Sequence, residues 1–360
     1  MSKAKTAAEP ESARRQVLFF LSAAALGVLL LRPLKTSFLV APALVAALTV
    51  LLIRYQDQHR EKTEVSRGKL LGAAGVSVLL GIVFAAVWLR TLRVVSLQYI
   101  DWKRSLPVLT AAVCSAPLAI PFLIRVLAAF AACRGEMDTQ IRGTGSPEFA
   151  KEERLSTEDR RLLLCTAIIA VSVCSLSSPL YPFNNWVDAN CFFTVGKSML
   201  SGVVPYRDLY EQKGPLLYAL YALAYPVSHR SFFGVWLMEI AAAYAFLNLS
   251  YRTMQLIMGC KSPPALLLTA VLVYTAPAFL KGGSAEEFCL PLMMLSVYYG
   301  TLLVLQDREL TGREALLIGL SSGAVLWVKY SMLGFYFGFI LVPACRMLRK
   351  HRAIQLLKLV

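Results

Sequence analysis

Charged residues and histidine are scarce in this chain of 360 residues. Asp, Glu, Lys and Arg together make up 16% of the sequence, and there are 3 histidines. Hydrophobic residues reach 57% and the mean hydropathy is +0.58, which is too apolar for a soluble domain of this length. His59, His229 and His351 are far apart, so the sequence offers no histidine-based metal-ligand spacing.

Paired cysteine motifs are also missing. The 8 cysteines are scattered and show no C-x-x-C spacing, which argues against metal and redox roles. Cys191 and Cys289 both fall near the predicted outer face, where an oxidising compartment would let them pair. An unpaired small hydrophobic residue is the favoured state of each.

The net charge of +15 does not indicate a nucleic-acid partner, because its distribution follows a membrane topology. With the N-terminus in the cytoplasm, the predicted inner segments hold almost twice as many Lys and Arg residues as the outer ones. Such a bias is the positive-inside rule of membrane proteins. Nucleic-acid binding is therefore excluded from the functions considered.

Hydrophobic runs long enough to cross a bilayer recur along the whole chain. They predict an all-α, polytopic membrane protein with about ten transmembrane helices, at 17–31, 36–53, 70–89, 106–124, 162–181, 233–251, 264–280, 288–305, 315–328 and 331–345. The first run is followed by Arg32-Pro33-Leu34-Lys35 rather than by small residues, so we expect no cleavable signal peptide.

One long polar segment divides the chain into two predicted modules. Residues 1–132 form a four-helix membrane module with almost no polar residue at mid-membrane depth. Residues 133–161, rich in charge, Gly, Ser and Pro, indicate a cytoplasmic linker. Residues 162–360 form the second membrane module, whose first outer connection is unusually long.

That connection, 182–232, is predicted to contain two juxtamembrane amphipathic helices. Asn184 or Asn185 can cap a first helix that runs to Leu200, and Gly202 can end it. Gly214 and Pro215 suit the N-cap and the first position of a second helix. We expect both helices to lie parallel to the outer membrane surface.

Acidic and basic side chains from three distant segments are expected in one outer layer. Asp188 lies in the first juxtamembrane helix and Lys213 before the second, while Glu286 and Glu287 begin a later span and Lys329 ends another. Unpaired charge at this depth is costly and usually functional. A plainer interpretation remains open for each residue: helix-dipole preference for the acids and headgroup contact for the lysines.

Three further features of the long connection have two interpretations each. Arg207 and Asp208 either contact a substrate or form a salt bridge that holds a turn. Lys213 precedes a helix start whose backbone N–H groups can bind a phosphate. VGKS at 195–198 resembles the end of a nucleotide-binding loop, but Cys191 stands where that motif needs its first Gly, so we predict no nucleotide site.

Taken together, these motifs resemble the first extracytoplasmic loop of GT-C glycosyltransferases. The resemblance rests on W-x-D-A-N at 186–190, G-K-x-x-x-x-G at 196–202, P-Y-x-D at 205–208, K-G-P at 213–215 and GGSAEEF at 282–288. Members of that superfamily, which includes protein O-mannosyltransferases and lipid A aminoarabinose transferases, transfer sugars from polyprenyl-phosphate donors. The resemblance covers about 160–350.

The resemblance implies a role for each matching residue. Asp188 would be the general base, Lys213 would meet the donor phosphate, and Glu286 or Glu287 would support the acceptor or a metal. The remaining substrate-binding candidates are Tyr206, Arg207, Asp208, Glu211 and Lys329. This chain departs from many relatives by having Gly214-Pro215 after the lysine and by stopping at HRAIQLLKLV, so the sequence is expected to be truncated or unusually short.

The chemistry suits these residues without the resemblance. A carboxylate can take the proton of an acceptor hydroxyl, and Lys213 can stabilise charge on a departing phosphate, which predicts inverting transfer of a sugar in the cell envelope. The expected partners are a polyprenyl-phosphate-linked sugar and the lipid bilayer. A divalent cation, the donor sugar, the acceptor and the oligomeric state stay open, and the alternative is a non-enzymatic transporter or lipid-binding scaffold.

Overall fold

The computed structural model describes residues 155–258, 263–276, 278–279, 281–305 and 311–349, with a few isolated positions before them. The spans predicted before residue 155 and most of the predicted linker therefore lie outside the described residues. Within the described ranges every regular element is a helix and no β-strand occurs. The all-α prediction is thus confirmed for this part of the chain.

The chain divides into two compact units. One comprises residues 1–135 and 267–275, and the other comprises 136–266 and 276–360. Almost all described helices belong to the second unit. The predicted module boundaries at 132 and 161 stay a prediction.

The helices are α5 (Thr157–Cys174), α6 (Val187–Met199), α7 (Pro215–Ala224), α8 (Phe233–Met258), α9 (Leu266–Tyr274), α10 (Ala285–Leu305), α11 (Gly312–Val328) and α12 (Gly334–Arg349). Short 3₁₀ turns flank three of them, at Tyr225–Val227, Pro263–Ala265 and Tyr330–Leu333.

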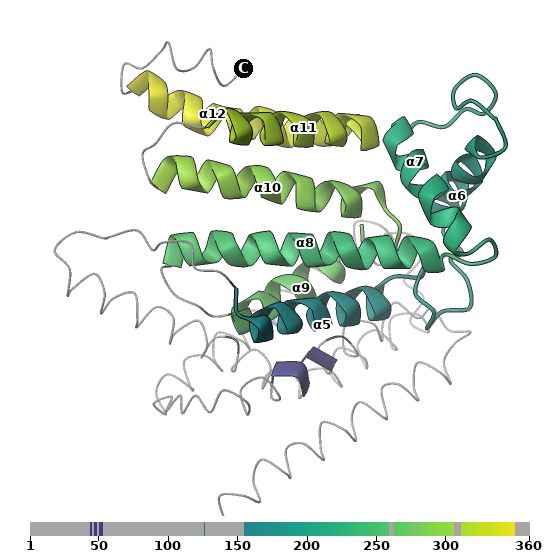
Figure 1. Ribbon diagram of the computed structural model, residues 1–360, viewed down its shortest axis with the longest axis horizontal. Coiled ribbons are helices and arrows are strands. Elements are labelled where there is room, and N and C mark those ends of the chain that lie inside the picture. Colours follow the sequence, from purple (N-terminus) through teal and green to yellow (C-terminus); the bar gives the residue numbers. More distant parts are fainter. Residues whose placement is uncertain are drawn as a thin grey trace, which may run out of the picture. The chain divides into compact units, whose positions relative to one another are not determined.

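Within the second unit, the long helices pack side by side. Figure 1 shows α10 between α8 and the pair α11 and α12, and α5 packs against α8. The helices α6 and α7 pack on each other, and α7 also contacts α8 and α11. The pair α6 and α7 therefore covers one end of the helix layer (Figure 1).

Local signals in the sequence set several helix ends. The Ser156 side chain accepts from the Asp159 N–H at the start of α5, and Thr311 and Glu314 form a capping box at the start of α11. Gly214 is the N-cap of α7 with Pro215 at its first position, as predicted. Gly202, which follows α6, has a φ of +85°, so it ends that helix with a conformation that glycine adopts readily.

The structure shows part of the predicted set of membrane-crossing helices. Among the described residues, only α8 and α10 are long and apolar enough to cross a bilayer. The run at 162–181 ends as a helix at Cys174, and the run at 264–280 yields the nine-residue α9. Both predicted spans continue beyond the last helical residue, because they were defined by hydrophobicity and apolar or small residues continue into the following loops. Ten spans are not shown.

The apolar stripe of α6 packs against α7 instead of facing lipid. Ala189, Phe192 and Gly196 are buried, and the Phe192 ring lies 5.7 Å from the ring of Tyr221. Tyr218 and Tyr221 of α7 are almost completely buried. The reason is that two adjacent amphipathic helices can cover each other's apolar faces.

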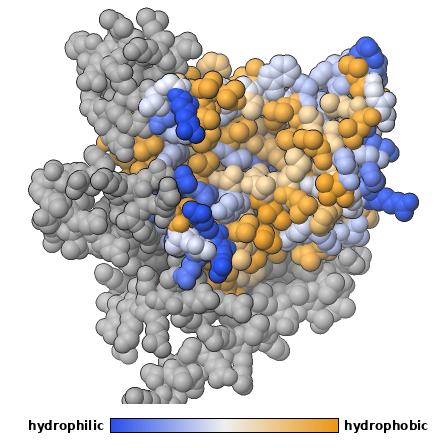
Figure 2. All heavy atoms as spheres, in the orientation of Figure 1, coloured by the Kyte–Doolittle hydropathy of each residue, from blue (hydrophilic) through white to orange (hydrophobic). Residues whose placement is uncertain are grey.

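Apolar side chains nevertheless remain exposed on the long helices. Figure 2 shows hydrophobic residues gathered over the middle of the visible face and hydrophilic ones toward both ends. Exposed large hydrophobic residues on α8, α11 and α12 include Leu237, Leu316, Leu320, Leu326, Phe337 and Leu341. An apolar band of this kind indicates contact with lipid or another apolar partner.

We predict that Gly196→Ala destabilises the α6–α7 pair. A Cβ at Gly196 would lie 2.7 Å from the Ala222 backbone nitrogen, so the helices would have to separate, at a cost of about 1–3 kcal/mol. Thermal unfolding in detergent should show the loss. The matched control is Gly319→Ala in α11, where a Cβ meets nothing within 4 Å and helix propensity favours alanine. Equal unfolding temperatures for the two variants would contradict the packing described.

Candidate functional site

A pocket of about 130 Å³ lies at the end of the helix layer that carries α6 and α7. Its wall is built by the loop before α6 and the first turns of that helix, the loop before α7, the segment before α10 with the first turn of α10, and the residue after α11. The lining residues are Trp186, Asp188, Phe192, Lys213, Ala278, Lys281, Ala285, Glu286 and Lys329. Four candidates chosen from the sequence, Asp188, Lys213, Glu286 and Lys329, thus meet in one pocket.

Asp188 comes from the first turn of α6 and is half-buried. Among the described residues, its carboxylate forms no hydrogen bond or ion pair. The helix is well fixed at this point, because Asn190 Nδ2 donates to the carbonyls of Asn184 and Trp186 at 2.8 Å. A carboxylate held in a pocket without a partner is available to accept a proton from a ligand.

Lys213 is brought to the pocket by a close contact between two backbones. The Gly214 N–H donates to the Val328 carbonyl at 3.0 Å, and a Cβ on Gly214 would lie 1.8 Å from the Trp327 carbonyl oxygen. Only glycine allows this approach. It places Lys213 beside the end of α11, where Lys329 follows.

The backbone before α7 differs from the predicted phosphate cradle. The Lys213 N–H donates to Glu211 Oε2 at 2.9 Å, the Gly214 N–H is used by Val328, and Pro215 has no N–H. These donors are therefore unavailable to an anion. The Lys213 side chain lines the pocket, and its ammonium forms no ion pair among the described residues.

Glu286 and Lys329 form an ion pair across the pocket wall. Lys329 Nζ donates to Glu286 Oε1, and the two side chains are 23% and 27% exposed. This pair connects the start of α10 to the end of α11. Each residue therefore has a structural partner as well as a place in the pocket.

Glu287 points elsewhere, although it is next in sequence. It is buried and forms a capping box with Ser284: the Ser284 N–H donates to Glu287 Oε2 at 3.0 Å, and the Glu287 N–H donates to Ser284 Oγ at 3.2 Å. The Glu287 carboxylate caps the N-terminus of α10 and does not line the pocket. Glu287 therefore fits the plainer interpretation, in which an acidic residue is preferred at a helix N-terminus. Glu286 lines the pocket.

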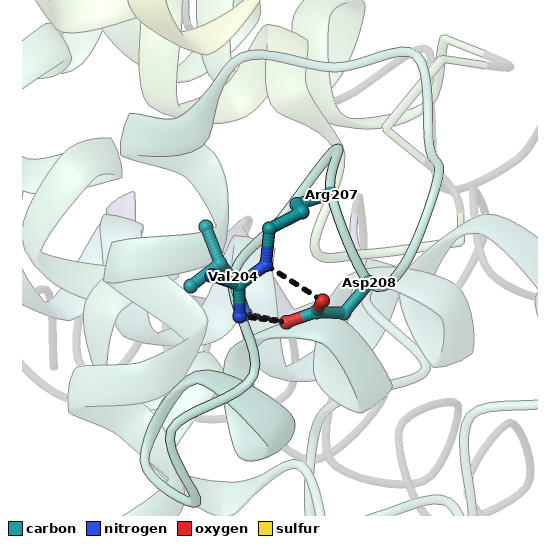
Figure 3. Close-up of polar contacts among 3 residues, drawn as sticks. All are labelled: Val204, Arg207 and Asp208. Carbon is teal, nitrogen blue, oxygen red and sulfur yellow. Dashed lines mark hydrogen bonds and ion pairs between the residues drawn. The ribbon is translucent and has the colours of Figure 1, made fainter.

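Arg207 and Asp208 do not line the pocket. They hold a turn together with Val204, as Figure 3 shows. Arg207 Nε and Nη2 donate to the two carboxylate oxygens of Asp208 at 2.8 Å, and the Val204 N–H donates to Asp208 Oδ2 at 2.8 Å. The hydrogen bonds from Arg207 and from the Val204 backbone lower the pKa of Asp208. The salt-bridge interpretation of this pair fits the geometry.

Tyr206 and Glu211 also do not line the pocket. Both form hydrogen bonds with the backbone of Lys213. Tyr206, whose φ is +68°, donates its hydroxyl to the Lys213 carbonyl. Glu211 accepts from the Tyr218 hydroxyl and from the Lys213 N–H. Partial burial raises the pKa of Glu211, but the hydrogen bonds from Tyr218 and the backbone outweigh it and leave that pKa below its usual value.

The turn before α10 is pinned by buried side chains. Gly282 and Gly283 have φ values of +71° and +72°, and the Tyr221 hydroxyl donates to the Gly283 carbonyl at 2.7 Å. A Cβ on Gly282 would lie 1.8 Å from Ser175 Oγ. Both glycines are therefore required by their backbone conformation and by close contact.

Sequence reasoning missed three residues of this region. Lys281 and Trp186 both line the pocket, and Lys281 Nζ lies 5.7 Å from the centre of the Trp186 ring. Glu239 of α8 is buried beneath the turn and accepts from Ser175 Oγ at 2.7 Å. A single acid inside the apolar run FGVWLMEIAAAYAF was the signal that could have found Glu239.

No group of three or more His, Cys, Asp and Glu residues is arranged to hold a metal ion within the described ranges. Asp188 and Glu286 are the carboxylates of the pocket, and Glu286 is already paired with Lys329.

Residues 149–355 match the family model described as "Putative competence-induced protein Ccs4 N-terminal domain". This match covers more than half of the chain and all of the pocket. The chain belongs to this family. No curated protein and no solved structure matches it.

The assignment to the GT-C superfamily is wrong. The matched family is the Ccs4 N-terminal domain, and no glycosyltransferase family is found. The motifs that carried the resemblance have structural explanations in this chain: Gly202 ends α6, Asp208 holds a turn, and Gly214 allows a close backbone contact. Short motifs of Gly, Pro and Asp arise wherever loops need them.

We predict that Asp208 titrates below the ordinary Asp pKa of about 3.9. Because its folded pKa is lowered, the turn gains stability from the ionised carboxylate above the unfolded pKa. This stability is lost as the pH falls through the folded pKa. An NMR titration of the Asp208 carboxyl carbon should show the low midpoint, and Arg207→Gln should raise it. An unchanged midpoint in that variant would contradict the arrangement in Figure 3.

Proposed function

We propose that this protein is a membrane glycosyltransferase that moves a sugar from a polyprenyl-phosphate donor to an extracytoplasmic acceptor of the cell envelope. Family membership does not support this function, which rests on the chemistry of the pocket. The observation that supports the proposal most strongly is that Asp188, Lys213 and Lys281 line one pocket. None of the three forms an ion pair among the described residues. Asp188 and Lys213 are half-buried, whereas Lys281 is exposed at the mouth of the pocket. A half-buried unpaired charge is expensive, so Asp188 and Lys213 are best explained by a charged ligand.

The charges in the pocket fit a phosphodiester. Glu286 and Lys329 neutralise each other, which leaves two ammonium groups and one carboxylate. Their net charge of about +1 matches the single negative charge of a sugar linked to a lipid through one phosphate. The exposed apolar faces of α8, α11 and α12 supply surface for a lipid tail.

The reaction then proceeds by single displacement. The Asp188 carboxylate takes the proton of the acceptor hydroxyl, and the acceptor oxygen forms a bond to the anomeric carbon. The bond between that carbon and the phosphate oxygen breaks, and its electron pair leaves with the polyprenyl phosphate. Lys213 and Lys281 stabilise the negative charge on that phosphate. Because one displacement occurs, the anomeric configuration is inverted.

Membrane topology is part of the same proposal. The end of α5, the starts of α8 and α10 and the end of α11 all lie at the end of the helix layer that carries the pocket. The hydrogen bond from Ser175 to Glu239 and the ion pair of Lys329 with Glu286 show this. We place this end outside the cell membrane, in a multi-pass protein with a cytoplasmic N-terminus. The positive-inside distribution of Lys and Arg supports this orientation.

We predict that Asp188→Asn lowers transfer of a labelled sugar from polyprenyl phosphate by about 10²- to 10⁴-fold, because the variant lacks a general base. Donor binding should be retained. Lys213→Ala should weaken donor binding by about 10- to 100-fold, the effect of one lost charge-assisted hydrogen bond. Transfer and donor affinity are measured in purified protein in lipid nanodiscs.

The matched controls change charge away from the pocket. Glu158→Gln removes an acid of α5, and Lys197→Met removes an exposed lysine of α6; both should keep wild-type transfer. Wild-type transfer by Asp188→Asn would remove the proposed base. Donor binding without any transfer by the wild-type protein would instead favour a lipid-binding scaffold.

We predict that a cysteine at Ser201 reacts with a membrane-impermeant thiol reagent from outside intact cells, whereas one at Thr157 does not. Both positions are exposed and lie at opposite ends of the helix layer. The background should lack the exposed Cys165 and Cys191. Equal labelling of both positions in intact cells would show that the proposed topology is wrong.

A further inference from the structure

We propose that Asn184 is a positioning residue that holds the two halves of the pocket in register and sets the Lys281 ammonium over the Trp186 ring. In this role it places Lys281 where the donor phosphate binds, a consequence that rests on the proposed function.

Asn184 uses both ends of its side chain, and it is 2% exposed. On one side, Asn184 Oδ1 accepts from the Trp186 N–H at 3.0 Å. On the other side, Asn184 Nδ2 donates to the carbonyls of Lys281 at 3.0 Å and Gly282 at 3.4 Å. The same amide nitrogen also lies 3.3 Å from Ser177 Oγ.

These bonds join segments that are 97 residues apart in sequence. Trp186 precedes Asp188 on the α6 side, whereas Lys281 and Glu286 belong to the α10 side. One buried amide therefore connects the backbones of both sides of the pocket. Because Asn184 satisfies a donor and two acceptors at once, no other side chain of similar size can replace it without leaving a buried polar group unpaired.

The contact between Lys281 and Trp186 is the measurable result. Lys281 Nζ lies 5.7 Å from the centre of the indole ring, within the range of a cation–π interaction. The segment is otherwise a left-handed Gly-Gly turn, which has no side chain of its own to fix its position. Removing the Asn184 bonds frees the Lys281 backbone and so moves its ammonium away from the ring.

The test uses the full chain with Trp186 as its single tryptophan, after replacing Trp88, Trp102, Trp236 and Trp327 with Phe. Lys281→Met removes the ammonium and should shift the emission of Trp186. Asn184→Asp, which replaces the donor with a carboxylate facing two carbonyls, should give the same shift. The double variant should show no further shift, because both changes remove one interaction.

The neighbouring Asn185 provides the matched control, since it is exposed. Asn185→Asp should leave the emission unchanged. An unshifted emission in Asn184→Asp, or additive shifts in the double variant, would overturn the inference. If Asn184→Asp does not fold, Asn184→Ser carries the same comparison.

The connection to substrate is tested separately by titrating the wild-type, Asn184→Asp and Lys281→Met proteins with polyprenyl phosphate. We expect about tenfold weaker binding in both variants, which corresponds to about 1.4 kcal/mol. Absence of binding to the wild-type protein would remove the proposed function and leave the emission result unaffected. Wild-type affinity in both variants would show that Lys281 does not meet the phosphate.

Discussion

The site depends on the backbone of the turn before α10 being held by buried side chains. Tyr221 donates to the Gly283 carbonyl, Asn184 donates to the carbonyls of Lys281 and Gly282, and Ser284 starts the helix with Glu287. A buried carbonyl without a partner is costly, so these bonds fix the turn in one conformation. The positions of Lys281 and Glu286 follow from it.

Charge in this molecule is separated by role. Arg207 with Asp208, and Glu287 with Ser284, serve turns and helix ends. Glu286 with Lys329 forms a pair that connects α10 and α11 at the pocket wall. Asp188 and Lys213 line the pocket and form no ion pair among the described residues, and we propose that they meet the ligand. A site with separate structural and ligand-facing charges can release its ligand without disturbing the fold.

Local features of the sequence predicted the start of α7 and the end of α6, because Gly214-Pro215 and Gly202 act through their own backbone conformations. The sequence also predicted that charged side chains at several helix ends lie in one layer, and Asp188, Lys213, Glu286 and Lys329 do line one pocket. The sequence could not show that Asn184 reaches Lys281, because that contact is long-range. Nor could it show that Tyr218 and Tyr221 are buried, since an amphipathic helix can cover lipid or a second helix with the same face. Short loop motifs gave a wrong family, because turn chemistry alone produces them.

The most direct test of the account is an experimental structure of the protein with a polyprenyl-phosphate sugar bound in a lipid nanodisc. The account predicts the phosphate in contact with Lys213 and Lys281, and the Asp188 carboxylate facing the anomeric carbon from the side opposite the phosphate. Density for the phosphate at another surface, with Asp188 remote from the sugar, would contradict it.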